Sequence, residues 1–170
     1  MPSPATSPAH PRVAAVARLL EEAGSRGEVR VLPTEVRTAA AAAAALGVPL
    51  GAIANSLLFE ADGSPVLILT SGAHRVDVSK VAALLGVPAL TPAPADAVRR
   101  ATGQVIGGVA PIGHPEPIGT LVDVELARYE VVWAAAGHPA SVFSTTYEEL
   151  LQLTGGTPAE VGGRPSEALA

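Results

Sequence analysis

Residues 102–115 read TGQVIGGVAPIGHP, and this stretch places four glycines and two prolines within fourteen positions. Glycine allows backbone conformations with positive φ and lets another molecule approach the main chain closely, while proline restricts the rest of the segment. Ordering such a loop costs chain entropy, so its shape is expected to serve a purpose. Two interpretations are open: a tight connection from a helix into a strand, or a loop that points backbone N–H groups at an anion or a developing oxyanion.

Length and composition favour one folded domain around the loop. The chain has 170 residues, of which 48% are hydrophobic, enough for one core and too few for two domains of ordinary size. Because only 3% of the residues are aromatic, the core must be built mainly from Ala, Val, Leu and Ile. The net charge of −5 argues against a broad basic face for nucleic acid. The same net charge is compatible with a local contact to one end of a nucleic acid.

Several classes of site are excluded by residue types that the sequence lacks. There is no cysteine, which excludes disulfides, thiolate catalysis and cysteine-based metal sites. The histidines show no HExxH spacing, so neither a catalytic metal nor another cofactor is expected. The first eleven residues lack the apolar stretch of a signal peptide, and the apolar run 39–46 is too short to cross a bilayer. We expect a cytoplasmic protein that makes no membrane contact.

The order of predicted elements indicates a mixed α/β (α+β) domain rather than a doubly wound parallel sheet. We expect a disordered leader over 1–11, a single domain over 12–160 and a flexible tail over 161–170, with chain fraying already after Gly155. Helices are predicted over 11–23, 34–45, 78–85, 94–101 and 146–153, with Thr34, Asp77 and Thr146 as N-caps. Strands are predicted over 28–32, 53–60, 65–70, 120–124, 130–135 and 141–144. Asp62-Gly63 is the hairpin signal between the second and third strands.

With these elements placed, two motifs in this order resemble the YbaK/prolyl-tRNA synthetase-associated editing domain family. They are the TGxxxGGVxPxG loop and AGHP at 136–139, and the similarity covers roughly residues 30–160. The resemblance implies a curled mixed sheet, described as a partial barrel, with helices outside. It also implies a deacylase that acts in trans and hydrolyses the ester of a mischarged aminoacyl-tRNA, for tRNA of the prolyl type. The implied partner is the aminoacyl-tRNA acceptor end, with an aminoacyl-tRNA synthetase as an optional second partner.

The resemblance also assigns candidate residues. The catalytic set would be Asn55, Gly107, Gly108 and His138, with the loop amides holding the oxyanion or the adenosine. His138 lies between Gly137 and Pro139 at the end of a predicted strand, where it would contact the substrate or position water. The other substrate-binding candidates are Ser56, Ser71, Arg75, Val109, Pro111, Gly113, Gly137 and Pro139.

Separate expectations concern three further residues. Asp123, near a strand end, is expected to hydrogen-bond the glycine-rich loop or to cap the following turn. Trp133 is expected in the core or in a pocket wall. His10 falls in the predicted leader, where no functional role is expected.

Asn55 departs from the family pattern, which has a lysine at this strand position. Three interpretations are open. The amide orients the substrate in a variant deacylase, or the site is weakened and the domain binds without hydrolysis, or Asn55 is an ordinary strand residue at a bend. A hydrolase of a different, non-tRNA ester in the same pocket is a further alternative.

Overall fold

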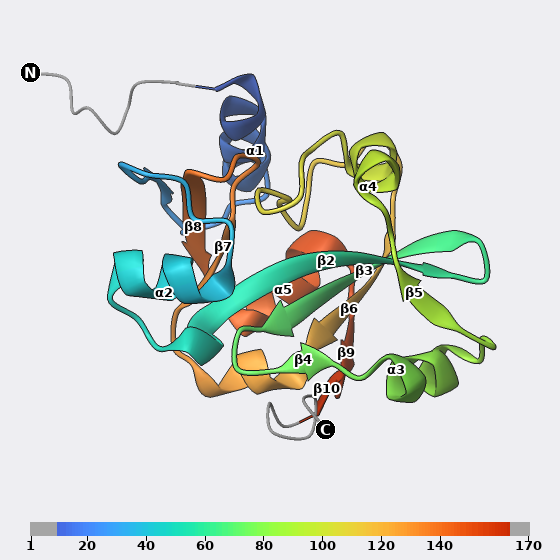
Figure 1. Cartoon of the computed structure of the whole chain (residues 1–170). Coiled ribbons are helices and arrows are strands. Elements are labelled where there is room, and N and C mark those ends of the chain that lie inside the picture. The colour runs from blue at the N-terminus through green and yellow to red at the C-terminus, as the bar shows by residue number, and fades with distance from the viewer. Residues whose placement is uncertain (1–9, 164–170) are drawn as a thin grey trace, which may run out of the picture.

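The computed structural model describes residues 10–163 and shows helices packed on both faces of a mixed sheet (Figure 1). The helices are α1 (Pro11–Glu22), α2 (Ala39–Leu46), α3 (Val78–Leu85), α4 (Ala95–Thr102) and α5 (Tyr147–Thr154), with 3-10 turns η2 (Leu50–Ala52) and η3 (Val124–Arg128). The strands are β1 (Val29–Val31), β2 (Ile53–Ala61), β3 (Ser64–Ser71), β4 (Arg75–Val76), β5 (Leu90–Pro92), β6 (Gly119–Asp123), β7 (Val132–Ala135), β8 (Ser141–Thr145), β9 (Thr157–Ala159) and β10 (Gly162–Gly163).

The main sheet has the order β1-β8-β7-β2-β3-β6-β9, and β5 pairs with β2 outside this path. The pairs β2–β7, β3–β6 and β6–β9 are parallel and the others are antiparallel. The two ends of this order, β1 and β9, do not pair with each other, so the sheet stays open and is not closed into a barrel. The predicted mixed α/β class is therefore confirmed. β4 and β10 form a separate two-stranded sheet.

The long strand β2 divides the core into two sides. Ala54 and Leu58 face the core under α1 and α5, which contribute Val16, Leu20 and Leu150. Ile53 packs with α2, and Phe59 packs with α3, on the opposite side. Because successive strand residues point to opposite faces, this alternation covers both faces of the sheet with helices.

The hairpin between β2 and β3 forms as the Asp-Gly signal predicts. Asp62 has φ of 52° and Gly63 has φ of 83°, so both central residues adopt the positive φ that a two-residue type I′ turn requires. The turn sets the register in which Asn55 lies opposite Thr70. Helix N-caps at Asp77 and Thr146 are also confirmed, since each side chain accepts a hydrogen bond from a backbone N–H in the first turn.

Two sequence-based predictions about the boundaries are wrong. The second helix begins after Thr38, whose side chain accepts from the Ala41 N–H, and not after Thr34. The residues before it stay extended because the Leu32 and Val36 N–H groups donate to the Ala140 and Pro139 carbonyls. The chain after Gly155 is also not frayed throughout: β9 pairs with β6, and Val161 is fully buried. Of the expected leader over 1–11 and tail over 161–170, residues 1–9 and 164–170 lie outside the described residues, whereas His10 caps α1 at Pro11 and residues 162–163 form β10.

Candidate functional site

A pocket opens where the sheet splits along one edge of β2. β3 pairs with β2 from Ala54 to Ala61. On the other edge, β7 pairs only with Ile53 and Ala54, and β5 pairs only with Phe59 to Ala61. Residues 55–57 therefore have no strand beside them on this edge. The pocket there contains about 470 Å³ of empty space, part of it open to solvent.

Four chain segments line the pocket: 36–42, 53–56, the loop at Gly107 and Val109, and 133–142. In Figure 1 the loop that follows α4 lies above β2, with α2 and β7 near one end of this strand. Most of the lining is small and apolar, including Ala42, Ile53 and Val142. The polar side chains in the lining are those of Arg37, Thr38, Asn55, Ser56, Trp133 and Ser141. No lining residue carries a carboxylate, imidazole, thiol or amine side chain.

The glycine-rich loop has a fixed shape, which its own side chains support. The Gln104 side chain is buried, and its Oε1 accepts a hydrogen bond of 2.6 Å from the Ala110 N–H. The Thr102 hydroxyl donates to the Val98 carbonyl and accepts from the Gln104 N–H. Gly107 has φ of 90°, which favours glycine. A Cβ at Gly108 would lie 2.7 Å from the His138 carbonyl carbon, so glycine is needed there for close approach.

The backbone donors of the loop are not equivalent. The Gly108 N–H donates to the Val105 carbonyl at 2.9 Å, so this amide, expected to meet the substrate, is occupied within the loop. The N–H groups of Gly107 and Val109 have no hydrogen-bond acceptor within residues 10–163. Both residues line the pocket. These two N–H groups are therefore the loop donors that remain for a ligand.

The strand β2 adds two polar side chains at the open edge. Asn55 and Ser56 are both partly buried and both line the pocket. The Ser56 hydroxyl oxygen is buried and has no hydrogen-bond partner in the described part of the chain. A buried polar group without a partner is costly, so a ligand that bonds to Ser56 would remove that cost.

Arg37 is the functional candidate that sequence reasoning missed. It lines the pocket, and its guanidinium contacts Glu35 Oε1 at 3.0 and 3.1 Å and the Ile106 carbonyl at 3.4 Å. Its main chain also lies against Gly107. Nothing local in the sequence marks this residue, because the contact joins segments about seventy positions apart.

Comparison with known proteins identifies the family. The model of the aminoacyl-tRNA editing domain matches residues 33–153. The chain belongs to the aminoacyl-tRNA editing domain family. It is 33% identical over 128 residues to the uncharacterized protein YwhH of Bacillus subtilis, covering 75% of this chain and 81% of that protein.

Two further relatives carry the name of prolyl-tRNA synthetase or proline–tRNA ligase. The crystal structure of a proposed trans-editing enzyme for prolyl tRNA synthetase matches with a TM-score of 0.85 and 40% identity, covering 91% of this chain and 98% of that one. Proline–tRNA ligase of Geobacter sulfurreducens is 36% identical over 92 residues, which is 54% of this chain and 16% of the ligase. The fold expected from the resemblance is thus confirmed.

His138 in the editing domain does not line the pocket. Its main chain packs against Gly108, while its ring lies 4.9 Å from the ring of His10, measured between centroids. His138 Nδ1 accepts from the Ala140 N–H at 3.0 Å, and His10 Nδ1 accepts from the Arg12 N–H at 3.2 Å as the N-cap of α1. Burial, followed by the nearby His138 and Arg12, lowers the pKa of His10. His10 therefore has a structural role as the N-cap of α1 beside His138, and the expectation that it has no functional role stays a prediction.

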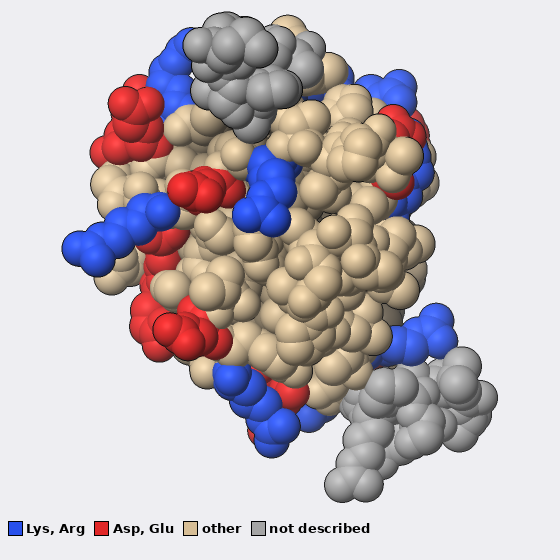
Figure 2. Space-filling model, turned by 90° about the vertical axis from the view of Figure 1, so that its left-hand side faces the viewer, with Lys and Arg blue, Asp and Glu red and all other residues tan. Residues whose placement is uncertain are grey.

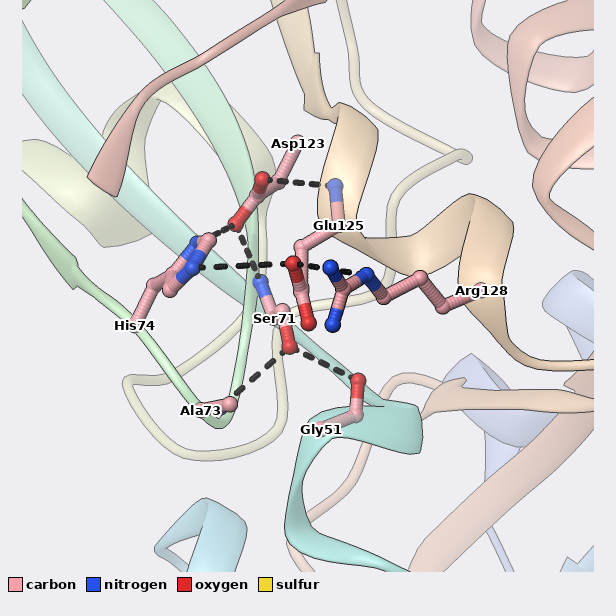
Figure 3. A network of polar contacts seen from close by, with 7 residues as sticks. All are labelled: Gly51, Ser71, Ala73, His74, Asp123, Glu125 and Arg128. Atoms are coloured by element: carbon pink, nitrogen blue, oxygen red, sulfur yellow. Dashed lines mark hydrogen bonds and ion pairs between the residues drawn. The ribbon is translucent and has the colours of Figure 1, made fainter. Parts of the chain in front are cut away.

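Ser71 and Arg75 also lie outside the pocket lining. The Ser71 hydroxyl donates to the Gly51 carbonyl at 2.7 Å, and its N–H donates to Asp123, as Figure 3 shows. Arg75 is exposed on β4. Neither position supports the expected contact with substrate in this pocket.

Asp123 joins the end of β3 to the turn after β6 (Figure 3). It is fully buried, and its carboxylate contacts the His74 ring at 2.9 Å and accepts from the Glu125 N–H at 3.0 Å. Glu125 lies 3.8 Å from His74 and 3.5 Å from Arg128. Of its two expected roles, capping the following turn is confirmed, and contact with the glycine-rich loop is absent among the bonds of residues 10–163.

The remaining candidates shape the loop and its support. Pro111, Gly137 and Pro139 are buried, and Gly113 is exposed with φ of 87°. The Pro139 carbonyl accepts from the Val36 N–H and so holds the segment that carries Arg37. Trp133 is both core and pocket wall, with the Arg30 guanidinium 4.8 Å from its ring centroid.

Neither a metal cluster nor a membrane span appears in the described residues. Within residues 10–163, no group of three or more His, Asp or Glu side chains is placed to hold a metal ion. No helix in the same part of the chain is long and apolar enough to cross a bilayer. The polar groups that line the pocket include backbone amides, the Asn55 amide, hydroxyls and the Arg37 guanidinium.

Proposed function

We propose that this editing domain hydrolyses the ester between an amino acid and the terminal ribose of a mischarged tRNA of the prolyl type, acting in trans. The observation that carries the proposal is the pocket at the open edge of β2, where Gly107, Val109 and Asn55 gather hydrogen-bond donors around small apolar walls. Membership in the editing family and the likeness to a proposed trans-editing enzyme for prolyl tRNA synthetase support it.

Ester hydrolysis in this pocket would use donors rather than a side-chain base, because no lining residue can take up a proton near neutral pH. A water molecule adds to the ester carbonyl, and negative charge develops on the carbonyl oxygen. The Gly107 and Val109 N–H groups and the Asn55 amide donate to that oxygen. When the intermediate collapses, the ribose oxygen leaves and takes the proton that the water gives up, which releases the free amino acid and the tRNA.

The walls of the pocket favour a small, uncharged amino-acid side chain. Ala42, Ile53 and Val142 leave limited space and offer no partner for a charged group. An apolar wall separates side chains that differ by one methylene by only about 1–3 kcal/mol. We therefore expect a preference for small residues rather than an absolute specificity for one.

The test is a deacylation panel of mischarged tRNAs, each incubated with the wild-type chain and with Asn55→Ala. Loss of one oxyanion donor typically lowers kcat by roughly 10²–10³-fold, so we expect Asn55→Ala to fall in that range. Gln152→Ala is the matched control, since it removes an exposed amide from α5 and should leave the rate unchanged. Absence of hydrolysis above background on every tRNA with the wild-type chain would reject the proposal.

One observation favours a second candidate, a domain that binds aminoacyl-tRNA without cleaving it. Asn55 brings no charge to a position where the family pattern has lysine. This candidate predicts that a non-hydrolysable aminoacyl-adenosine binds while all mischarged tRNAs stay intact. Asn55→Lys separates the two: a gain of hydrolysis indicates a weakened site, and a loss indicates a site adapted to the amide.

A further inference from the structure

Arg37 is the one ionisable side chain that lines the pocket in the described part of the chain. Its Nε–H donates to Glu35 and its Nη1 donates to the Ile106 carbonyl, while Nη2 lies 3.0 Å from the same Glu35 oxygen. N–H groups on Nη1 and Nη2 therefore remain for a ligand. The side chain is 56% exposed, so a ligand at the pocket mouth can reach it.

The position of Arg37 is held from three directions. Its neighbour Thr38 caps α2, so the main chain at this point is fixed. The guanidinium bonds to the glycine-rich loop at Ile106, and the Arg37 main chain lies against Gly107. The guanidinium therefore lies at the glycine-rich loop, on the side of the Ile106 carbonyl. The Gly107 N–H group belongs to the same trans peptide unit, points the other way and has no acceptor within residues 10–163.

The surface around the pocket offers few other positive charges, so the charge of Arg37 matters for binding an anion. Figure 2 shows the face at the left of Figure 1, where α2 lies: much of it is uncharged, and the basic side chains are scattered around it, several beside acidic ones, rather than forming a basic stripe. The chain as a whole carries a net charge of −5. A polyanion that enters the pocket therefore contacts one nearby positive charge, that of Arg37, and not a broad surface of positive electrostatic potential.

We propose that Arg37 binds the phosphate on the 5′ side of the ribose that carries the amino acid. This inference rests on the proposed function. If the ester carbonyl lies at the Gly107 and Val109 amides, the nearest negative charge of the nucleic acid is that phosphate, and guanidinium N–H groups pair well with phosphate oxygens. Glu35 keeps the guanidinium oriented when the pocket is empty and is exposed enough to yield to the phosphate.

Binding of two amide-linked analogues tests the proposal. One is adenosine with alanine joined to the ribose by a non-hydrolysable amide, and the other is the same molecule with a 5′-phosphate. For the wild-type chain, the phosphate should strengthen binding roughly tenfold, as expected for an exposed charge-assisted contact. Arg37→Gln should abolish that gain while leaving the affinity for the phosphate-free analogue within about twofold, and Arg37→Lys should keep part of it.

Arg100→Gln is the matched control. Arg100 also pairs with a carboxylate, that of Asp96 at 3.0 Å, and lies outside the pocket lining, so its removal should leave the phosphate gain intact. In turnover, Arg37→Gln should raise KM for mischarged tRNA roughly tenfold and leave kcat within about twofold.

The outcomes separate this inference from the proposed function. Equal binding of both analogues by the wild-type chain, a phosphate gain that survives Arg37→Gln, or a loss of kcat at unchanged KM would each overturn the role of Arg37 and leave the deacylase proposal standing. Failure of the wild-type chain to bind either analogue would overturn both.

Discussion

Replacing Gly108 by alanine tests whether close contact between the glycine-rich loop and the turn at 138–139 shapes the site. Gly108 does not need a positive φ, so alanine suits its backbone conformation. The added Cβ would, however, lie 2.7 Å from the His138 carbonyl carbon and the Pro139 nitrogen, and 2.8 Å from Pro139 Cδ. Ordinary contact begins at 3.4 Å, so the two segments must separate by about 0.7 Å.

This separation has a cost in stability and in activity. All three contacts involve main chain or a proline ring, which cannot rotate away, and overpacking of this kind costs about 1–3 kcal/mol of unfolding free energy. For a chain of this size, 2 kcal/mol corresponds to a fall in Tm of roughly 4–8 °C. Because a displacement near 1 Å at the reacting groups can lower a rate by roughly 100-fold, deacylation should fall by roughly 10- to 100-fold.

The measurement combines urea unfolding, followed by fluorescence of the single Trp133, with deacylation of mischarged tRNA. Gly119→Ala is the control, because an added Cβ there meets nothing within 4 Å and should change stability by less than about 0.5 kcal/mol. An unfolding midpoint and a rate for Gly108→Ala that equal those of the wild type would refute the packing argument.

Two further predictions concern the cap of α2 and the pH dependence of stability. Thr38→Ala should lower the unfolding free energy by about 1 kcal/mol because it removes the N-cap of α2. Thr34→Ala changes the cap that was predicted from the sequence and should have little effect. Equal urea midpoints for the two variants would contradict this prediction. Burial lowers the pKa of His114 below its ordinary 6.5, so its stabilising contribution is present above about pH 6.5 and is lost as pH falls. Between pH 7 and 5, the unfolding free energy of His114→Gln, measured with urea, should therefore fall less steeply than that of the wild type. Some pH dependence should remain in the variant, because the pKa of His10 is also lowered. Equal pH dependence of the unfolding free energy in the two proteins would contradict the role given to His114.

Local signals in the sequence predicted much of the secondary structure. The Asp62-Gly63 turn and the caps at Asp77 and Thr146 depend on residues within a few positions of one another, and all three form as expected. The start of α2 was misplaced because Thr34 is a plausible cap by local rules. Distant bonds from Leu32 and Val36 to residues 139–140 keep this segment extended.

The short strands β5 and β9 were missed for a related reason. β5 contains Pro92 and has only three residues, so nothing in its own sequence favours a strand. It exists because the edge of β2 at Phe59–Ala61 offers unpaired backbone groups. β9 likewise forms against β6. Short strands follow from the sheet that they join, which a local pattern does not record.

The candidate site also combines features that the local sequence predicts with features that depend on tertiary contacts. The sequence alone determined the family, through the glycine-rich loop and the AGHP motif, and it placed Asn55, Ser56, Gly107 and Val109 among the candidates that now line one pocket. Only the tertiary structure showed that the Gly108 amide is occupied, that the His138 ring faces His10, and that Arg37 stands at the pocket mouth. A motif records which residue types a loop requires, whereas the direction of a donor and the position of a distant cation depend on contacts between segments that meet only when the chain folds.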